Sequence, residues 1–370
     1  MTALATDPCR GALPVNNANL RAVCIAQGAP AGTIGLIKNP TAGQANAVFS
    51  GALYLRPETS DSYTFGVVLQ PSFIPGLSIT VDYYHILITH AISQPAPQDI
   101  VNNCFGDNNG SGVTAASATN PLCLLFHRNP VTGGLDGDPA TTPGVTFVTS
   151  NSGRILTDGI DFAVNYRRDL GFAKLNLSLN GNWTHRSLFQ ATAPGSVVPP
   201  GYPGAGTPVP ASATRECVGL YSANCGSPGS AGPNPGSTPG SLQPEFSWLQ
   251  RTTLTFGDID VSLMWRHISS MNAEPGAKPQ VFNGTITAGS LAGQTFNFAH
   301  IPAYNWFDLS TRFSINDHLD LTFTVQNLLN KLPPIVGSTI GSTSFNSGNT
   351  FPSTYDALGR RYAVSARLRF

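Results

Sequence analysis

The sequence has little charge. Only 11% of its 370 residues are Asp, Glu, Lys or Arg, and the formal net charge is +0, whereas about a quarter of the residues in a soluble globular domain are charged. There is no basic excess and no basic run, so nothing favours a nucleic-acid partner. No stretch of about 18 apolar residues occurs, so a transmembrane helix is not expected. Membrane-crossing β-strands need only about ten alternating residues and escape that test.

Catalytic and metal-binding motifs are also missing. There is no C-x-x-C, no H-E-x-x-H and no G-x-S-x-G, so a zinc site, a metalloprotease or a serine hydrolase has no support. The histidines are scattered without paired spacing, which favours rim or interface positions over metal ligation: His85, His90, His127, His185, His267, His300 and His318. We therefore expect no enzymatic activity, no catalytic residues, no cofactor and no metal site.

The first residues do not resemble a secretory signal peptide. Met1 to Arg10 has neither a basic head nor an apolar core, and a protein that crosses the inner membrane needs both. We expect the chain to be a piece of a longer protein, or its start to be mis-assigned.

Strict alternation of apolar and polar residues is what the sequence has instead. In His318 to Asn330, the residues Leu319, Leu321, Phe323 and Val325 share one face of a strand. In Tyr362 to Phe370, the apolar face lies opposite Ser365, Arg367 and Arg369. A period of two is the signal of a β-strand. One apolar face opposite an arginine-bearing face is typical of an outer-membrane barrel, where one side meets lipid and the other a wet lumen.

The lengths of the connections alternate as well. Nine strands are predicted, with short turns near Ile74, Leu170, Gly257 and Asn316. The long loops fall at about 93–143, 191–243, 272–302 and 332–357. Short turns on one rim and long loops on the other are the outer-membrane pattern. The predicted fold is all-β: an antiparallel transmembrane β-barrel segment of about nine strands, with short periplasmic turns and long extracellular loops.

The six cysteines fall as three local pairs: Cys9 with Cys24, Cys104 with Cys123, and Cys217 with Cys225. Fifteen pairings of six cysteines exist, and reduced thiols or a metal site are the alternatives. The sequential pairing is favoured because each pair lies within one Gly-, Pro- or Asn-rich loop segment. All three pairs fall on the side of the long loops, in an oxidising compartment where disulfides persist.

Further side chains are assigned to the two faces. Asp61, Asp82, Asp161, Asp260, Asp308 and Asp320 are expected on or near the inward faces, as part of a solvated wall rather than as catalytic groups. The large aromatics suit an interfacial girdle, with a packed core as the alternative: Trp183, Trp248, Trp265, Trp306, Tyr83, Tyr166 and Tyr304.

Two motifs carry a resemblance to a known family. The segment from Leu55 to Gly66 resembles the L-x-P-E-x-S-x-x-Y-x-x-G strand start of TonB-dependent outer-membrane receptors. Asn327 to Lys331, then Gly359 to Tyr362 and a terminal Phe370, resembles the end of the same receptors. The resemblance spans roughly Leu55 to Phe370. It implies the carboxy-terminal barrel portion of such a receptor, in the cell outer membrane of a Gram-negative bacterium.

This resemblance implies energised uptake of a scarce ligand: a siderophore, cobalamin, a saccharide or a peptide. Family members have a barrel of about 22 strands with a plug; no plug is recognised here, so the chain alone is expected to be unable to transport, and TonB to act only through a missing plug. The expected partners are outer-membrane lipid and the assembly machinery, which reads a terminal strand with an aromatic end. Here that signal is Tyr362, Val364, Leu368 and Phe370.

The chain is expected to divide at residue 57. Residues 1–57 are expected to be an irregular extracellular loop segment without its own core, and residues 58–370 the carboxy-terminal part of the barrel. The alternative function is a plug-less passive pore or a surface adhesin, formed by strand addition or oligomerisation.

Overall fold

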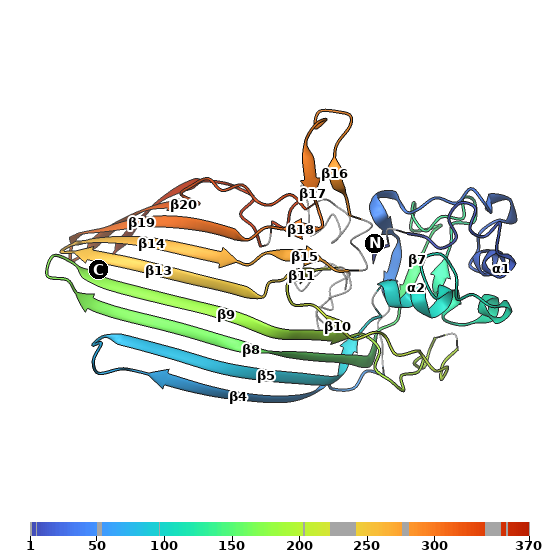
Figure 1. Ribbon diagram of the computed structural model, residues 1–370, viewed down its shortest axis with the longest axis horizontal. Coiled ribbons are helices and arrows are strands. Elements are labelled where there is room, and N and C mark those ends of the chain that lie inside the picture. The colour runs from blue at the N-terminus through green and yellow to red at the C-terminus, as the bar shows by residue number, and fades with distance from the viewer. Residues whose placement is uncertain are drawn as a thin grey trace.

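The protein consists of an elongated antiparallel sheet with a small lobe at one end (Figure 1). The computed structural model describes residues 2–4, 6–49, 54–95, 97–202, 204–222, 242–275, 281–336, 349–352 and 354–369. Within these ranges, no helix is both long enough and apolar enough to cross a membrane.

Nine long strands form the sheet, and each pairs antiparallel with the next one along the chain. They are β4 (Thr59–Leu69), β5 (Leu77–Ser93), β8 (Ser150–Asp169), β9 (Lys174–Gln190), β13 (Phe246–Phe256), β14 (Ile259–Ile268), β19 (Tyr304–Asn316), β20 (Leu319–Gln326) and β21 (Arg361–Leu368). The short strand β10 (Arg215–Glu216) adds a tenth member beside β9. The prediction of an all-β antiparallel fold with about nine strands is confirmed.

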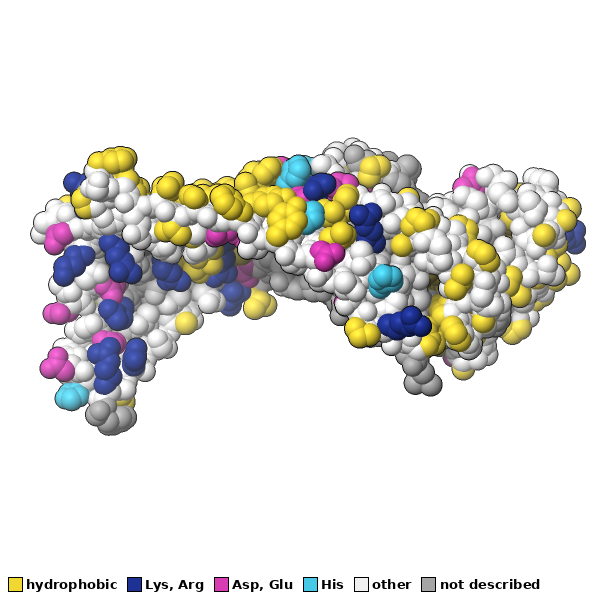
Figure 2. Space-filling model, turned by 90° about the horizontal axis from the view of Figure 1, so that it is seen from below, with side chains coloured by type: hydrophobic (Ala, Val, Ile, Leu, Met, Phe, Trp, Pro, Cys, Tyr) yellow, Lys and Arg dark blue, Asp and Glu magenta, His cyan; other side chains and the backbone are white. Residues whose placement is uncertain are grey.

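The register of the strands places the apolar residues on one face. Leu321 pairs with Ala366, Phe323 with Val364, and Val325 with Tyr362. Residues opposite one another in a sheet share a face, so apolar rows continue from strand to strand. Figure 2 shows hydrophobic side chains gathered along one surface of the sheet, and Lys, Arg, Asp and Glu side chains within its hollow side. We call these the outward face and the concave wall.

Short and long connections alternate between the two ends of the sheet, as predicted. The short ones are residues 70–76, 170–173, 257–258 and 317–318; the long ones are 94–149, 191–245, 269–303 and 327–360. Gly76 shows how tight a short turn is: its φ is +85°, and an added Cβ would lie 2.1 Å from the carbonyl oxygen of Arg167. Only glycine fits such a position without strain.

The lobe combines two separate parts of the chain, residues 2–49 and 97–147. Its elements are β1 (Thr2–Ala3), α1 (Ala18–Ala26), β2 (Gln44–Ala45), β3 (Ala47–Phe49), α2 (Pro97–Phe105), β6 (Phe126–His127) and β7 (Gly144–Phe147), with four 3₁₀ turns at Ala31–Thr33, Thr41–Gly43, Ala115–Thr119 and Cys123–Leu125. β7 lies between β3 and β6, parallel to β3 and antiparallel to β6.

A hydrophobic core joins these two parts. Leu20 and Val23 of α1 are buried with Ile100 and Phe105 of α2 and with Phe126. The first segment thus shares a core with the first long loop, which its composition did not indicate. Asn17 caps α1, its side-chain oxygen accepting the N–H of Leu20 at 3.0 Å, which satisfies a free donor of the first turn.

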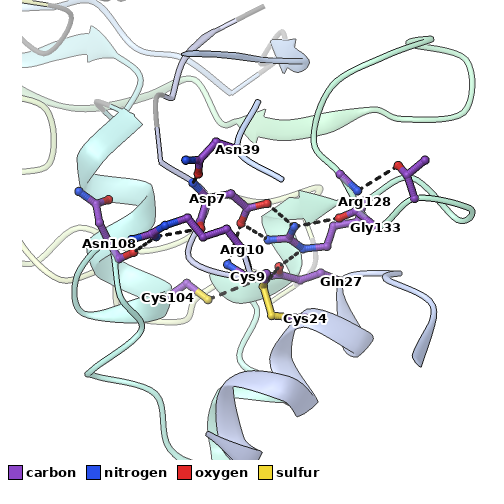
Figure 3. A network of polar contacts seen from close by, with 12 residues as sticks. Asp7, Cys9, Arg10, Cys24, Gln27, Asn39, Cys104, Asn108, Arg128 and Gly133 are labelled. Carbon is purple, nitrogen blue, oxygen red and sulfur yellow. Dashed lines mark hydrogen bonds and ion pairs between the residues drawn. A yellow bond between two sulfur atoms is a disulfide. The ribbon is translucent and has the colours of Figure 1, made fainter. Parts of the chain in front are cut away.

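A buried ion pair also ties the two parts together (Figure 3). The Arg128 guanidinium donates to both carboxylate oxygens of Asp7, at 2.7 and 2.8 Å, and to the side chain of Gln27 at 2.8 Å. Both charged side chains are 0% exposed. Two parallel bonds to one carboxylate make this the strong geometry for such a pair.

A second cluster lies at the loop end of the later strands. It involves β11 (Leu220–Tyr221), β12 (Leu242–Gln243), β15 (Met271–Ala273) and β18 (His300–Ile301), which form a small sheet. Tyr221, Met271, Ile301 and Tyr355 are buried there. The hairpin of β16 (Asn283–Thr285) and β17 (Thr295–Asn297) projects from this end (Figure 1).

Candidate functional site

The concave wall contains an open hollow of about 540 Å³ across β5, β8, β9, β13, β14 and β19. Its polar lining includes Asp82, Asp161, Asn180, Asn182 and Arg266. The register explains why these residues meet: Asp82 pairs with Asp161, and Asp161 with Asn182. Alternation on three neighbouring strands thus places carboxylate and amide groups in one row.

Hydrogen bonds fix this row. The Asn182 amide donates to Asp161 at 2.8 Å and to the Tyr84 hydroxyl at 3.1 Å. The Thr184 hydroxyl donates to the side-chain amide oxygen of Asn182 at 2.8 Å. A Cβ on Gly66 would lie 1.8 Å from an Asp82 carboxylate oxygen, so this glycine gives the Asp82 side chain its place on the wall. The row offers charged and neutral hydrogen-bonding groups to a polar solute.

Ion pairs between neighbouring strands continue the wall toward β21. Arg266 contacts Asp308 at 2.5 Å, Arg312 pairs with Asp260, and Arg369 contacts Asp320 at 2.5 Å. Asp308 also accepts the backbone N–H of Asn327 at 2.7 Å. The guanidinium of Arg266 lies 5.5 Å from the ring centre of Trp306, within the range of a cation–π contact. Each of these three carboxylates therefore has an arginine beside it.

The register corrects three assignments made from the sequence. Asp61 pairs with Leu87 and so lies on the outward face. Trp306 pairs with Arg266, and Tyr304 with Ile268, which places both aromatics on the concave side rather than in an outward girdle. The girdle aromatics that do lie outward are Tyr83, Tyr166, Trp183, Trp248 and Trp265. The period of each strand leads to the same faces: Tyr304 and Trp306 lie at even spacing from Asp308, and Asp61 lies at even spacing from Tyr63 and Phe65. The assignments made from the sequence therefore did not follow the alternation of their own strands.

A cluster on the outward face was not anticipated. Asp158 is 0% exposed, and its carboxylate accepts from Arg186 at 2.8 Å and contacts the ring nitrogen of His185 at 3.0 Å. The ring nitrogen of His85 lies 3.4 Å from it, and the Tyr63 ring stacks on His85 at 4.6 Å. The cluster joins β4, β5, β8 and β9 through a buried acid.

A β-bulge produces this cluster. The register shifts between Asp158 and Gly159, so that Arg186 faces Asp158 and His185 is the extra residue of β9. Bulges redirect side chains in this way. The signal in the sequence was a lone Asp158 between the outward residues Leu156 and Ile160. Its partners could not be found from alternation, because the bulge breaks the alternation of β9.

The cysteines lie at the loop end of the sheet. Disulfides join Cys9 to Cys24 and Cys104 to Cys123, both inside the lobe. Cys217 follows β10, whereas Cys225, its expected partner, lies outside the described residues. In the described ranges, no group of three His, Cys, Asp or Glu side chains is arranged to hold a metal ion.

Three of the four residues expected to form the assembly signal lie on the outward face of β21. Tyr362 is 74% exposed, Val364 68% and Leu368 61%. Phe370 lies outside the described residues. Because β21 pairs only with β20 in the part of the chain that is described, its other edge is open. The role of these residues in assembly stays a prediction.

Similarity to solved structures is broad but low in identity. The FrpB iron transporter from Neisseria meningitidis matches with a TM-score of 0.45 and 12% identity, covering 88% of this chain and 33% of its own. A variant of the ferric enterobactin receptor PfeA from Pseudomonas aeruginosa matches with a TM-score of 0.45 and 12% identity, covering 87% of this chain and 32% of its own. The siderophore receptor PirA from Acinetobacter baumannii matches with a TM-score of 0.43 and 14% identity, covering 87% of this chain and 33% of its own. The chain thus spans about a third of the length of these proteins.

Family comparison identifies the chain. No curated protein matches it. The family described as TonB dependent receptor-like, beta-barrel, matches residues 16–328, well over half of the 370 residues. The chain therefore belongs to the TonB-dependent receptor-like β-barrel family.

Proposed function

We propose that this sheet forms part of the wall of an outer-membrane barrel that takes up a scarce ligand with energy supplied by TonB. The observation that supports it is the two-faced sheet: apolar rows on the outward face and paired charges on the concave wall. Lipid accepts the first face and a wet lumen the second. Long connections and the lobe then stand at the end that receives the ligand from outside.

The concave hollow supports a polar ligand or a polar lumen rather than a reaction. Its carboxylates, amides and the Arg266 guanidinium bind polar groups, and Trp306 adds an aromatic surface beside them. Each charged pair of the wall is held across two strands, so the wall is organised before a solute arrives. These features suit the binding and passage of a polar solute.

A genetic test addresses uptake directly. A strain lacking the gene competes with its parent on limiting supplies of a siderophore-bound iron, cobalamin, a saccharide or a peptide. We expect a growth deficit on one supply, and no added deficit when TonB is also absent, because both losses block the same step. The proposal would be contradicted if deleting the gene slowed a TonB-less parent as much as it slows the TonB-containing parent, or if no supply gave a deficit.

Localisation is tested in the same strains. An antibody against residues 311–369 should detect a heat-modifiable band in the outer-membrane fraction, because closed barrels resist unfolding by detergent until heated. A band confined to the soluble fraction would exclude an outer-membrane wall.

We further propose that Tyr362, Val364, Leu368 and Phe370 form a signal for the assembly machinery. The exposed outward row of β21 supports this, since three of the four residues present an apolar surface beside an open strand edge. Deleting Phe370 should lower the amount of protein in the outer membrane several-fold. Replacing the inward-facing Ser365 by alanine is the matched control, and equal amounts for deletion and wild type would refute the signal.

A further inference from the structure

The lobe has a hollow of its own, away from the concave wall. It measures about 530 Å³ and is formed by two segments, residues 10–16 and 37–39. Its polar lining consists of Arg10, Asn16, Lys38 and Asn39, with no carboxylate. A surface that has two cations and two amides but no acid carries a positive potential.

The charge of Arg10 is not neutralised by its neighbours. Its guanidinium donates to the carbonyl oxygens of Asp7 and Asn108, at 3.1 and 2.7 Å, and to the side-chain oxygen of Asn109 at 3.0 Å. All three acceptors are uncharged. The bonds hold the guanidinium in place (Figure 3) and leave its positive charge available to a ligand.

The acidic side chains Asp7 and Asp107, which are close to these segments, form hydrogen bonds with other groups of the lobe. Both oxygens of the Asp7 carboxylate accept from Arg128. The Asp107 carboxylate accepts the backbone N–H groups of Asn109 and Ser111 in its own loop, at 2.8 and 3.0 Å. In the described residues, Lys38 is exposed and has no ion-pair partner. The lining of the hollow itself therefore contains two cations and no carboxylate.

The start of α1 strengthens that field. Asn16, which lines the hollow, directly precedes the N-cap Asn17, and the first turn of α1 contains no acidic residue. The amino end of a helix has a partial positive charge and stabilises a nearby anion.

The site is also preformed. The backbone N–H of Gly11 donates to the carbonyl oxygen of Ile37 at 2.9 Å, which joins the two lining segments. The disulfide between Cys9 and Cys24 fixes the first segment to α1. Little ordering is needed before a ligand binds, and preorganisation of this kind favours affinity.

We propose that this hollow binds an oxyanion, the carboxylate or phosphate group of a small molecule. Lys38 supplies an ion pair, the Arg10 guanidinium a fixed cation, and the amides of Asn16 and Asn39 neutral hydrogen bonds. The site is a property of the lobe and does not depend on uptake.

The test measures binding by titration calorimetry with the whole chain, folded in detergent, at constant ionic strength. The probes are inorganic phosphate and citrate. Lys38→Gln should weaken binding of at least one probe about tenfold, as expected for loss of one charge-assisted hydrogen bond. Asn39→Asp should weaken it at least as much, because it adds a negative charge while keeping an acceptor for the Asp7 N–H, which Asn39 now accepts at 3.0 Å.

Arg21→Gln is the matched control, because Arg21 is an exposed cation on α1 that does not line the hollow; its affinity should equal that of the wild type. The proposal is overturned if neither probe binds the wild type, or if all variants bind equally. It is also overturned if Arg21→Gln loses as much affinity as Lys38→Gln, which would indicate unspecific attraction. Binding only to vesicles with anionic phospholipid would assign the hollow to a headgroup and overturn the proposal for a free oxyanion.

Discussion

The lobe and the sheet place their large apolar side chains differently. In the lobe, apolar side chains such as Leu20, Phe105 and Phe126 are fully buried. In the sheet, Asp158, Asp308 and Asp320 are only 0%, 6% and 4% exposed, whereas Phe65 is 74% and Phe323 47% exposed. The lobe thus hides apolar surface from water, whereas the sheet presents it outward, as the proposed lipid-facing wall requires.

The regions also differ in how they hold a buried acid. Asp7 and Asp158 are both 0% exposed, and each has an arginine partner. Arg128 is likewise 0% exposed, whereas Arg186 is 41% exposed and shares its acid with two histidines. The acid of the lobe depends on one cation, and the acid of the sheet on three groups. This difference can be tested by removing each cation in turn.

Replacing Arg128 by methionine should have the largest effect. It leaves the Asp7 charge buried without its cation, which typically costs about 3–5 kcal/mol. We expect the lobe to become sensitive to protease while the sheet stays heat-modifiable on a gel. Arg21→Met, at an exposed position of α1, should leave the lobe resistant. Loss of heat-modifiability in Arg128→Met would show that the two regions do not fold separately.

The next largest effect is expected when an arginine is placed on the outward face of β9 rather than on its concave face. Leu179 lies on the outward face and Asn180 on the concave wall. An arginine in the middle of a lipid-facing band costs about 2–4 kcal/mol, whereas a lumen position tolerates it. We expect Leu179→Arg to reduce the amount in the outer membrane and lower the gel transition temperature, and Asn180→Arg to do neither. Equal behaviour of the two variants would invalidate the assignment of faces.

Arg186→Met should be milder than Arg128→Met. His85 and His185 stay within 3.4 and 3.0 Å of the Asp158 carboxylate, so the acid is not left alone. We expect a loss of about 1–3 kcal/mol, the range for losing a partner of a buried polar group. The gel transition temperature would report it. A loss as large as that of Arg128→Met would show that the histidines do not compensate.

The smallest effect is expected at Asp107 in the lobe. The backbone N–H of Ser111 is the main reason why the pKa of this carboxyl lies below 3.8, with further bonds from Asn109 and the Ser111 hydroxyl. A lowered pKa means that the ionised form stabilises the loop above about pH 4, and that this contribution disappears as the pH falls through the native pKa. Asp107→Asn should therefore lower protease resistance of the lobe slightly at pH 7 and by less at pH 3. If the variant and the wild type differ in protease resistance by the same amount at pH 7 and at pH 3, the carboxylate charge is not the cause.

The sheet could be predicted because its signal is local. Leu319, Leu321, Phe323 and Val325 alternate along β20, and Gly257 marks the short turn between β13 and β14. Such patterns report the solvent on each side of a strand without reference to its neighbours. The faces of Trp306 and Tyr304 follow from the same alternation, because both residues lie at even spacing from Asp308 in β19; the girdle assignment overlooked this.

The lobe could not be predicted, because its core has no period. Leu20 and Val23 meet Phe126 and Phe147 across about a hundred residues of chain, and the surrounding segments are rich in Gly, Asn and Pro. The Asp158 cluster was missed for a related reason, since a single extra residue in β9 brings Arg186 to it. The lobe's oxyanion hollow depends on the same nonlocal folding, because residues 10–16 and 37–39 form it only after α1 has packed.

The discontinuous lobe sets an order of assembly. The hairpin of β4 and β5 separates its two parts along the chain, and Thr59 pairs with Thr89 where that hairpin returns to the lobe. Each disulfide closes within one part, so the junction between the parts is non-covalent: Asp7 with Arg128, and the Asn46 amide with the carbonyl oxygen of Thr142 at 2.8 Å. The disulfide of each part can therefore form before the two parts meet. The parts pack together only once the hairpin of β4 and β5 has brought its two ends side by side. The packed lobe then holds the ends of this first strand pair together.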